Sequence, residues 1–81
     1  MYKIKSKQGL LTSQDRVAAQ IITSILNEVS NWTLPAEERI KFEETISGFA
    51  RYRDGWYEVE RVDIFPFYDR LMSLYADEIG L

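Results

Sequence analysis

The residues best suited to chemistry cluster around an Asp-Gly pair in the second half of the chain. Arg51, Arg53, Asp54, Trp56 and Glu58 lie within one short stretch. Trp and Arg are the side chains that most often dominate binding energy at protein interfaces. The five residues are therefore the candidate partner-binding site of this sequence.

The Asp54-Gly55 pair predicts how that stretch folds. A two-residue type I′ turn needs positive φ at both positions, which Asp-Gly tolerates well, so the pair favours a β-hairpin. The resulting register places Arg51 opposite Glu58 as an ion pair and Arg53 opposite Trp56 as a cation–π pair. In an alternative interpretation the preceding helix continues through Tyr52, and Asp54-Gly55 ends it.

Catalytic and metal-binding residue types are scarce. The chain has no Cys and no His, which removes thiolate chemistry, the commonest general base and the commonest transition-metal ligand. Glu37, Glu38, Glu43 and Glu44 lie on one expected helix, where Glu37 and Lys41 have the spacing of an ordinary surface ion pair. We expect no enzymatic activity, no metal site and no cofactor.

The charge balance narrows the classes of partner. Ten Lys and Arg residues face 13 Asp and Glu residues, a net charge of −3, and this disfavours nonspecific nucleic-acid binding. Lys3, Lys5 and Lys7 alternate with Tyr2 and Ile4, as in a strand with one solvent-exposed face. The lysines would either protect a sheet edge against aggregation or contact phosphates. No stretch resembles a signal peptide or a membrane span, so the expected location is the cytoplasm, with no membrane partner.

The spacing of apolar residues predicts three helices. The first spans about residues 13–29, with Thr12 and Asp15 spaced for a capping box and Val17 in its apolar stripe. The second begins at Pro35 and stops near Gly48. The third is capped by Asp63 or Phe65, has Pro66 in its first turn, and stops at Gly80. Trp56, and either Phe65 or Phe67, are the aromatic residues hardest to place in a core.

The predicted fold class is α+β: a single small domain over residues 1–81 with the order β-α-α-β-β-α. A three-stranded antiparallel sheet contains the hairpin and is covered by the helices, and the lysines of the first strand lie beside Glu58 and Glu60. The alternative is an all-α three-helix domain.

Three functional hypotheses from different classes remain. The leading one is a small non-enzymatic protein-binding module, an inhibitor or regulatory accessory factor of antitoxin-like or phage type, which occludes a surface of a larger partner. One alternative is a winged-helix-like nucleic-acid-binding regulator, suggested only by the order of elements. The other is a homo-oligomeric structural protein in which a second copy completes a helix stripe.

Overall fold

The chain forms three short strands and three longer helices within residues 2–9 and 12–80, which the computed structural model describes. In chain order the elements are β1 (Ile4–Ser6), α1 (Ser13–Ser30), α2 (Ala36–Phe49), β2 (Ala50–Arg53), β3 (Trp56–Val59), the 3₁₀ helix η1 (Arg61–Asp63) and α3 (Ile64–Ile79). This order confirms the α+β class and the β-α-α-β-β-α arrangement, and it excludes the all-α alternative.

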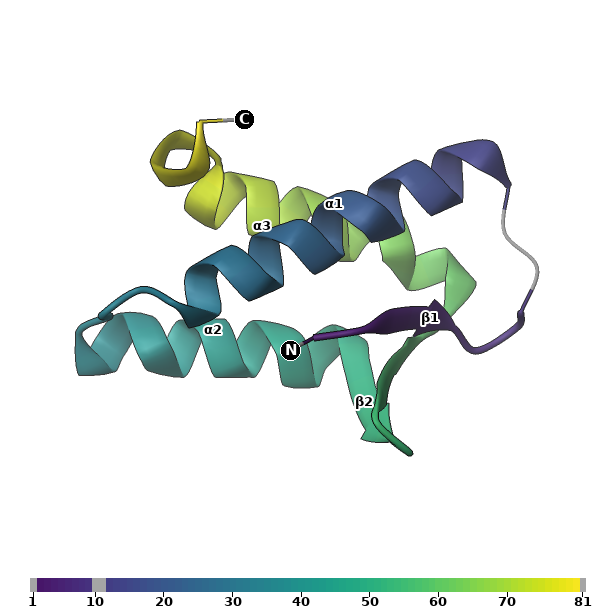
Figure 1. Cartoon of the computed structure of the whole chain (residues 1–81), viewed down its shortest axis with the longest axis horizontal. Coiled ribbons are helices and arrows are strands. Elements are labelled where there is room, and N and C mark those ends of the chain that lie inside the picture. The colour runs from purple at the N-terminus through teal and green to yellow at the C-terminus, as the bar shows by residue number, and fades with distance from the viewer. Residues whose placement is uncertain (1, 10–11, 81) are drawn as a thin grey trace.

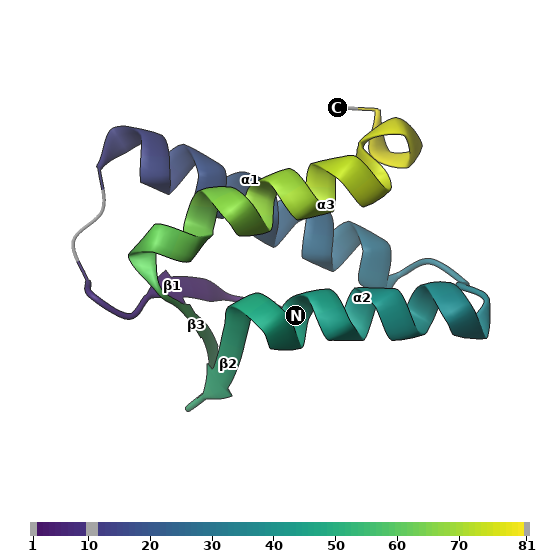
Figure 2. The same ribbon diagram turned by 180° about the vertical axis from the view of Figure 1, so that it is seen from behind.

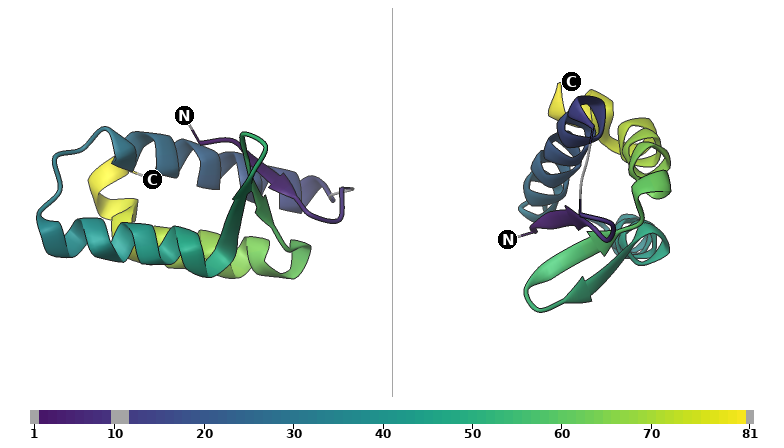
Figure 3. Two further views of the ribbon diagram at one scale, coloured as in Figure 1. Left: turned by 90° about the horizontal axis from the view of Figure 1, so that it is seen from below. Right: turned by 90° about the vertical axis from the view of Figure 1, so that its right-hand side faces the viewer.

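The helices form a three-cornered cluster that the sheet closes on one side. α1 packs mainly against α3, and α2 runs beneath both (Figure 1, Figure 2). Seen end-on in Figure 3, the sheet lies on the side between α1 and α2, and the tip of the hairpin projects away from the helices. One face of the sheet therefore covers the core, and the other is open.

The direction of β1 differs from the predicted one. β3 is the central strand, β2 pairs with it antiparallel, and β1 pairs with it in parallel, so the sheet is mixed rather than antiparallel. Two helices separate β1 from the hairpin, so no local turn fixes its direction, and a helical connection is what parallel pairing requires. The register still places Lys5 opposite Glu58, as expected for the lysine face.

The hairpin register is confirmed residue by residue. Arg53 lies opposite Trp56, Arg51 opposite Glu58, and the remaining pairs follow in step. Asp54 and Gly55 have φ of 51° and 85°, the positive values that a type I′ turn needs. Helix α2 ends at Phe49, one residue beyond the expected Gly48. Ala50 has an extended backbone conformation and is the first residue of β2, so the helix cannot continue.

The core resolves one expectation about apolar side chains and corrects another. Phe67 is fully buried and stacks on Phe49, with ring centroids 5.1 Å apart, so it joins α3 to α2. Phe65 is the aromatic residue of that pair that lies outside the core, at 44% exposure. Val17 is also outside, at 55% exposure, because the contact of α1 with α3 follows the face of Ala18, Ile22 and Ile25.

Asp15 connects the start of α1 to Arg61 of η1, the 3₁₀ helix that precedes α3. Thr12 and Asp15 form the predicted capping box, and the Asp15 carboxylate also accepts a hydrogen bond from Arg61 Nε at 3.0 Å. Its side chain is only 9% exposed. The hydrogen bonds from Thr12, and then from Arg61, lower the pKa of Asp15 below its ordinary value of 3.8.

This lowered pKa predicts how stability depends on pH. The ionised carboxylate is favoured in the folded chain, so its contribution is complete above the ordinary value and is lost as the pH falls through the folded value. We expect Asp15→Asn to be less stable than wild type at pH 7, with the difference shrinking as the pH falls below about 4. Urea unfolding of both chains from pH 7 to pH 2.5 checks this; a difference that stays constant with pH would contradict it.

Candidate functional site

The open face of the sheet gathers basic side chains from strands that are far apart in the sequence. Because side chains alternate along each strand, Ile4, Tyr57 and Val59 point toward the helices. Side chains at the alternate positions of the three strands point away from the helices. Five of these outward-pointing side chains are basic, namely Lys3, Lys5, Lys7, Arg51 and Arg53. All five side chains are exposed, and we call this surface the outer face.

Trp56 is the first residue of the central strand β3 and lies on the outer face beside the turn. It is 40% exposed, and its ring is flanked by Lys3 Nζ at 5.7 Å and Lys5 Nζ at 5.6 Å from the ring centroid. These distances suit cation–π attraction. The cations come from β1, which corrects the predicted Arg53–Trp56 pair: the contact of Arg53 is with the Asp54 carboxylate, 3.8 Å from its Nε.

The acidic residues of this surface are mostly engaged by neighbouring cations. Lys7 Nζ lies 3.1 Å from Glu60, which also accepts a hydrogen bond from the side chain of Gln8. The hydrogen bonds from Gln8, and then from Lys7, lower the pKa of Glu60. Glu58 lies between Lys5 and Arg51 in the register, although the predicted Arg51–Glu58 ion pair is not closed to contact distance among the described residues.

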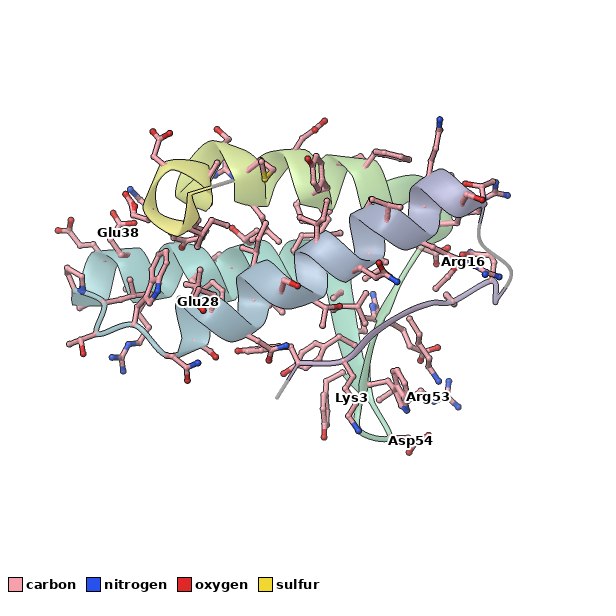
Figure 4. All side chains as sticks on the ribbon, turned by 45° about the horizontal axis from the view of Figure 1, so that its top comes forward. Lys3, Arg16, Glu28, Glu38, Arg53 and Asp54 are labelled. Carbon is pink, nitrogen blue, oxygen red and sulfur yellow. The ribbon has the colours of Figure 1, made fainter. Side chains whose placement is uncertain are left out.

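Charge is therefore unevenly distributed over a chain whose net charge is −3. The outer face with its turn carries half of the ten basic residues, and only three acidic ones, namely Asp54, Glu58 and Glu60. The other ten acidic residues lie elsewhere. Figure 4 shows Lys3, Arg53 and Asp54 together at the projecting end of the sheet, and Glu28 and Glu38 away from them toward the left of the view. The outer face is a local basic surface on an acidic protein.

The structure brings the predicted site residues together and adds three that sequence reasoning left out. Arg51, Arg53, Trp56 and Glu58 share the outer face, and Asp54 lies in the turn beside them. Lys3, Lys5 and Lys7 join them because β1 pairs with β3. The alternation of lysines in the sequence indicates a strand with one solvent-exposed face. Only the parallel pairing of this strand with β3 places the lysines on the same face as Trp56.

The glutamates of α2 lie on its surface. Glu37, Glu43 and Glu44 are exposed, and Glu38 lies 3.5 Å from Lys41, in place of the predicted Glu37–Lys41 pair. Within residues 2–9 and 12–80, no cluster of three or more acidic side chains is arranged to hold a metal ion. In the same residues, every helix is either too short or too polar to span a bilayer.

A second surface is apolar and lies between the first turns of α1 and α3. A shallow groove of about 510 Å³ is lined there by apolar side chains that include Val17, Ile21, Phe65 and Tyr68. It is the place where a second copy of the chain would cover exposed apolar residues, and homo-oligomerisation stays a prediction.

Comparison with known proteins adds no further information. No model of a protein family, no curated protein and no solved structure matches this chain. The chemistry of the outer face is therefore the basis for the function proposed below.

Proposed function

We propose that this chain is a non-enzymatic protein-binding module of the cytoplasm that inhibits or regulates a larger protein by covering part of its surface. The contact surface is the outer face of the sheet. The observation that carries the proposal is Trp56, an exposed aromatic ring with the ammonium groups of Lys3 and Lys5 within cation–π distance and Arg53 opposite it on β2.

The energetics of interfaces support this choice of surface. Trp and Arg are enriched among the few residues that carry most of the binding energy, and they lie near the centre of an interface. Basic residues around them complement an acidic partner, speed association and exclude partners of the wrong charge. An antitoxin-like or phage-type inhibitor needs only such a surface and a rigid support, because it acts by steric occlusion.

The first experiment is a pull-down from a source lysate with the wild-type chain and with Trp56→Ala/Arg53→Ala. Because both residues belong to the proposed contact, we expect a stoichiometric protein partner that the double variant binds at least about 30-fold more weakly, corresponding to about 2 kcal/mol. The matched control is Ile40→Ala/Arg70→Ala, which removes an exposed apolar side chain and an exposed Arg from α2 and α3. Equal capture by both double variants, each folded, would refute the proposed surface.

The outer face also supports a second candidate function, the binding of single-stranded nucleic acid. Basic side chains around an exposed aromatic ring form the kind of platform on which bases stack. The winged-helix version of this idea is less favoured, because α2 would present Glu37 and Glu44 to the phosphates. A titration of single-stranded DNA at increasing salt tests it: binding that weakens steeply with salt supports it, and no binding at low salt excludes it.

A further inference from the structure

The two edges of the sheet differ in how their backbone is used. The edge formed by β1 is fastened to α1, because Asn27 accepts a hydrogen bond from the Tyr2 amide at 2.7 Å and donates one to the Tyr2 carbonyl at 3.1 Å. The opposite edge is β2, and it lies on the outside of the projecting hairpin (Figure 3). Within the described residues no side chain of a helix is hydrogen-bonded to the backbone of β2, so another chain could reach this edge without displacing such a bond.

The hydrogen bonds of β3 show which groups of β2 are free. The Tyr57 amide donates to the Lys3 carbonyl at 2.7 Å, and the Val59 carbonyl accepts from the Lys7 amide at 2.9 Å, so both residues use their backbone toward β1. Their partners on β2, Tyr52 and Ala50, are therefore at the non-hydrogen-bonded positions of the antiparallel pair. The amide and carbonyl of Tyr52 and the carbonyl of Ala50 point away from the sheet.

A cleft lies beside β2 and extends over the outer face of the sheet. Its volume is about 630 Å³, and its walls come from the end of α2, from β2 and from Lys7, Glu58, Glu60 and Asp63. Glu60 is already paired with Lys7, whereas Arg51 has no ion pair among the described residues and Arg53 contacts only the exposed Asp54. A strand added to β2 would meet the free backbone groups of Tyr52 and Ala50, and the guanidinium groups of Arg51 and Arg53 would lie beside it on the outer face.

We infer that the partner adds an extended acidic strand to the free edge of β2, an inference that rests on the function proposed above. In such β-strand addition the backbone hydrogen bonds give affinity and the alternating side chains give specificity. Acidic side chains at every second position of the added strand would lie beside Arg51 and Arg53, and the residue between them would lie beside Tyr52, whose side chain is 67% exposed.

Charge also shows why the added strand is not a second copy of β2. If two β2 strands paired antiparallel about Tyr52, Arg51 of each copy would lie opposite Arg53 of the other. Like charges directly opposite each other destabilise a strand pair. The free edge is thus protected against self-pairing and suited to an acidic segment.

The test uses synthetic heptapeptides in which Glu alternates with Val, titrated into the isotopically labelled full chain and followed by NMR. We expect saturable binding, with slower hydrogen exchange of the Tyr52 amide. A peptide with Lys in place of Glu should bind at least about tenfold more weakly, because it repels Arg51 and Arg53. N-methylation of the peptide amides that face β2 should cost at least about tenfold, since these bonds are then lost.

Variants at one position separate the backbone from the side chain. Tyr52→Pro removes the free amide without breaking a bond within the sheet, whereas Tyr52→Ala keeps the amide and removes the ring. We expect a loss of about tenfold or more for Tyr52→Pro and less than about threefold for Tyr52→Ala. If Tyr52→Pro does not fold, the N-methylated peptide tests the same bonds on the wild-type chain.

Three results would overturn the inference: no binding of the Glu-Val peptide at millimolar concentration, equal binding of the N-methylated peptide, or displacement of the acidic peptide by single-stranded DNA at equal concentration. Failure of the inference is distinguishable from failure of the proposed function. A partner that is still lost with Trp56→Ala/Arg53→Ala, but binds regardless of the Tyr52 amide, would retain the module and exclude strand addition.

Discussion

Replacing Phe67 with alanine should destabilise the chain by about 3–5 kcal/mol. The Phe67 ring is fully buried and stacks on Phe49 at 5.1 Å with an interplanar angle of 10°, so the truncation leaves a cavity between α3 and α2. For a domain of this length the whole free energy of unfolding is about 4–12 kcal/mol. Urea unfolding at pH 7 should therefore show a midpoint far below that of wild type.

Phe65→Ala provides the matched control, because Phe65 is of the same residue type and only two positions away on α3. Its side chain is largely outside the core, so its truncation should change the free energy of unfolding by about 0.5 kcal/mol or less. Equal effects of the two substitutions would mean that the packing of α3 against α2 is not as described.

The second large effect is on binding. Arg51→Glu/Arg53→Glu should weaken the complex with the captured partner by at least about 100-fold, because two attractive charges become repulsive toward an acidic surface. Both side chains are exposed, so the fold loses only weak surface interactions: the Arg53–Asp54 contact is lost, and the cross-strand pairing of Arg51 with Glu58, about 0.2–1 kcal/mol, becomes a repulsion of similar size. Surface plasmon resonance at several salt concentrations measures the loss, and the loss should decrease as salt increases.

A variant of identical net charge separates the local charge from the overall charge. Arg39→Glu/Arg70→Glu makes the same change on α2 and α3, where both side chains are exposed. We expect it to alter affinity by less than about threefold. Comparable losses from the two double variants would show that the net charge, and not the outer face, governs association.

Local signals in the sequence predicted the fold well where neighbouring residues decide the structure. Asp54-Gly55 fixed the hairpin register, because the turn type sets which residues lie opposite each other. Thr12 and Asp15 marked the start of α1, and Gly80, with φ of 73°, marked the end of α3. Each of these features depends on contacts within a few positions of the chain.

Features that depend on long-range packing were not predictable in the same way. The direction of β1 is set by its tie to Asn27 and by the two helices that follow it, so the parallel pairing could not be inferred from Tyr2 and Ile4. Phe65 and Phe67 have the same side chain but lie about 200° apart around α3, so the face that α3 turns toward α1 and α2 decides which one is buried. Val17 fits the apolar stripe of α1 but lies beyond the contact with α3.

The candidate site was predictable in part for the same reason. Arg51, Arg53, Trp56 and Glu58 were identified because they lie in one hairpin. The contribution of Lys3, Lys5 and Lys7 depends on the long-range pairing of β1 with β3. The net charge of −3 is an average over the whole chain, and it conceals a local surface of opposite sign.

The most direct test of the central claim is an NMR map of the surface that contacts the captured partner. Backbone amide signals of the labelled chain are followed during addition of the partner, with free and saturated states compared at each residue. The outer face predicts that the large changes fall in residues 3–7 and 50–58, with the exposed sides of α2 and α3 unaffected. Changes confined to the groove around Val17 and Phe65, with Trp56 unaffected, would contradict the claim.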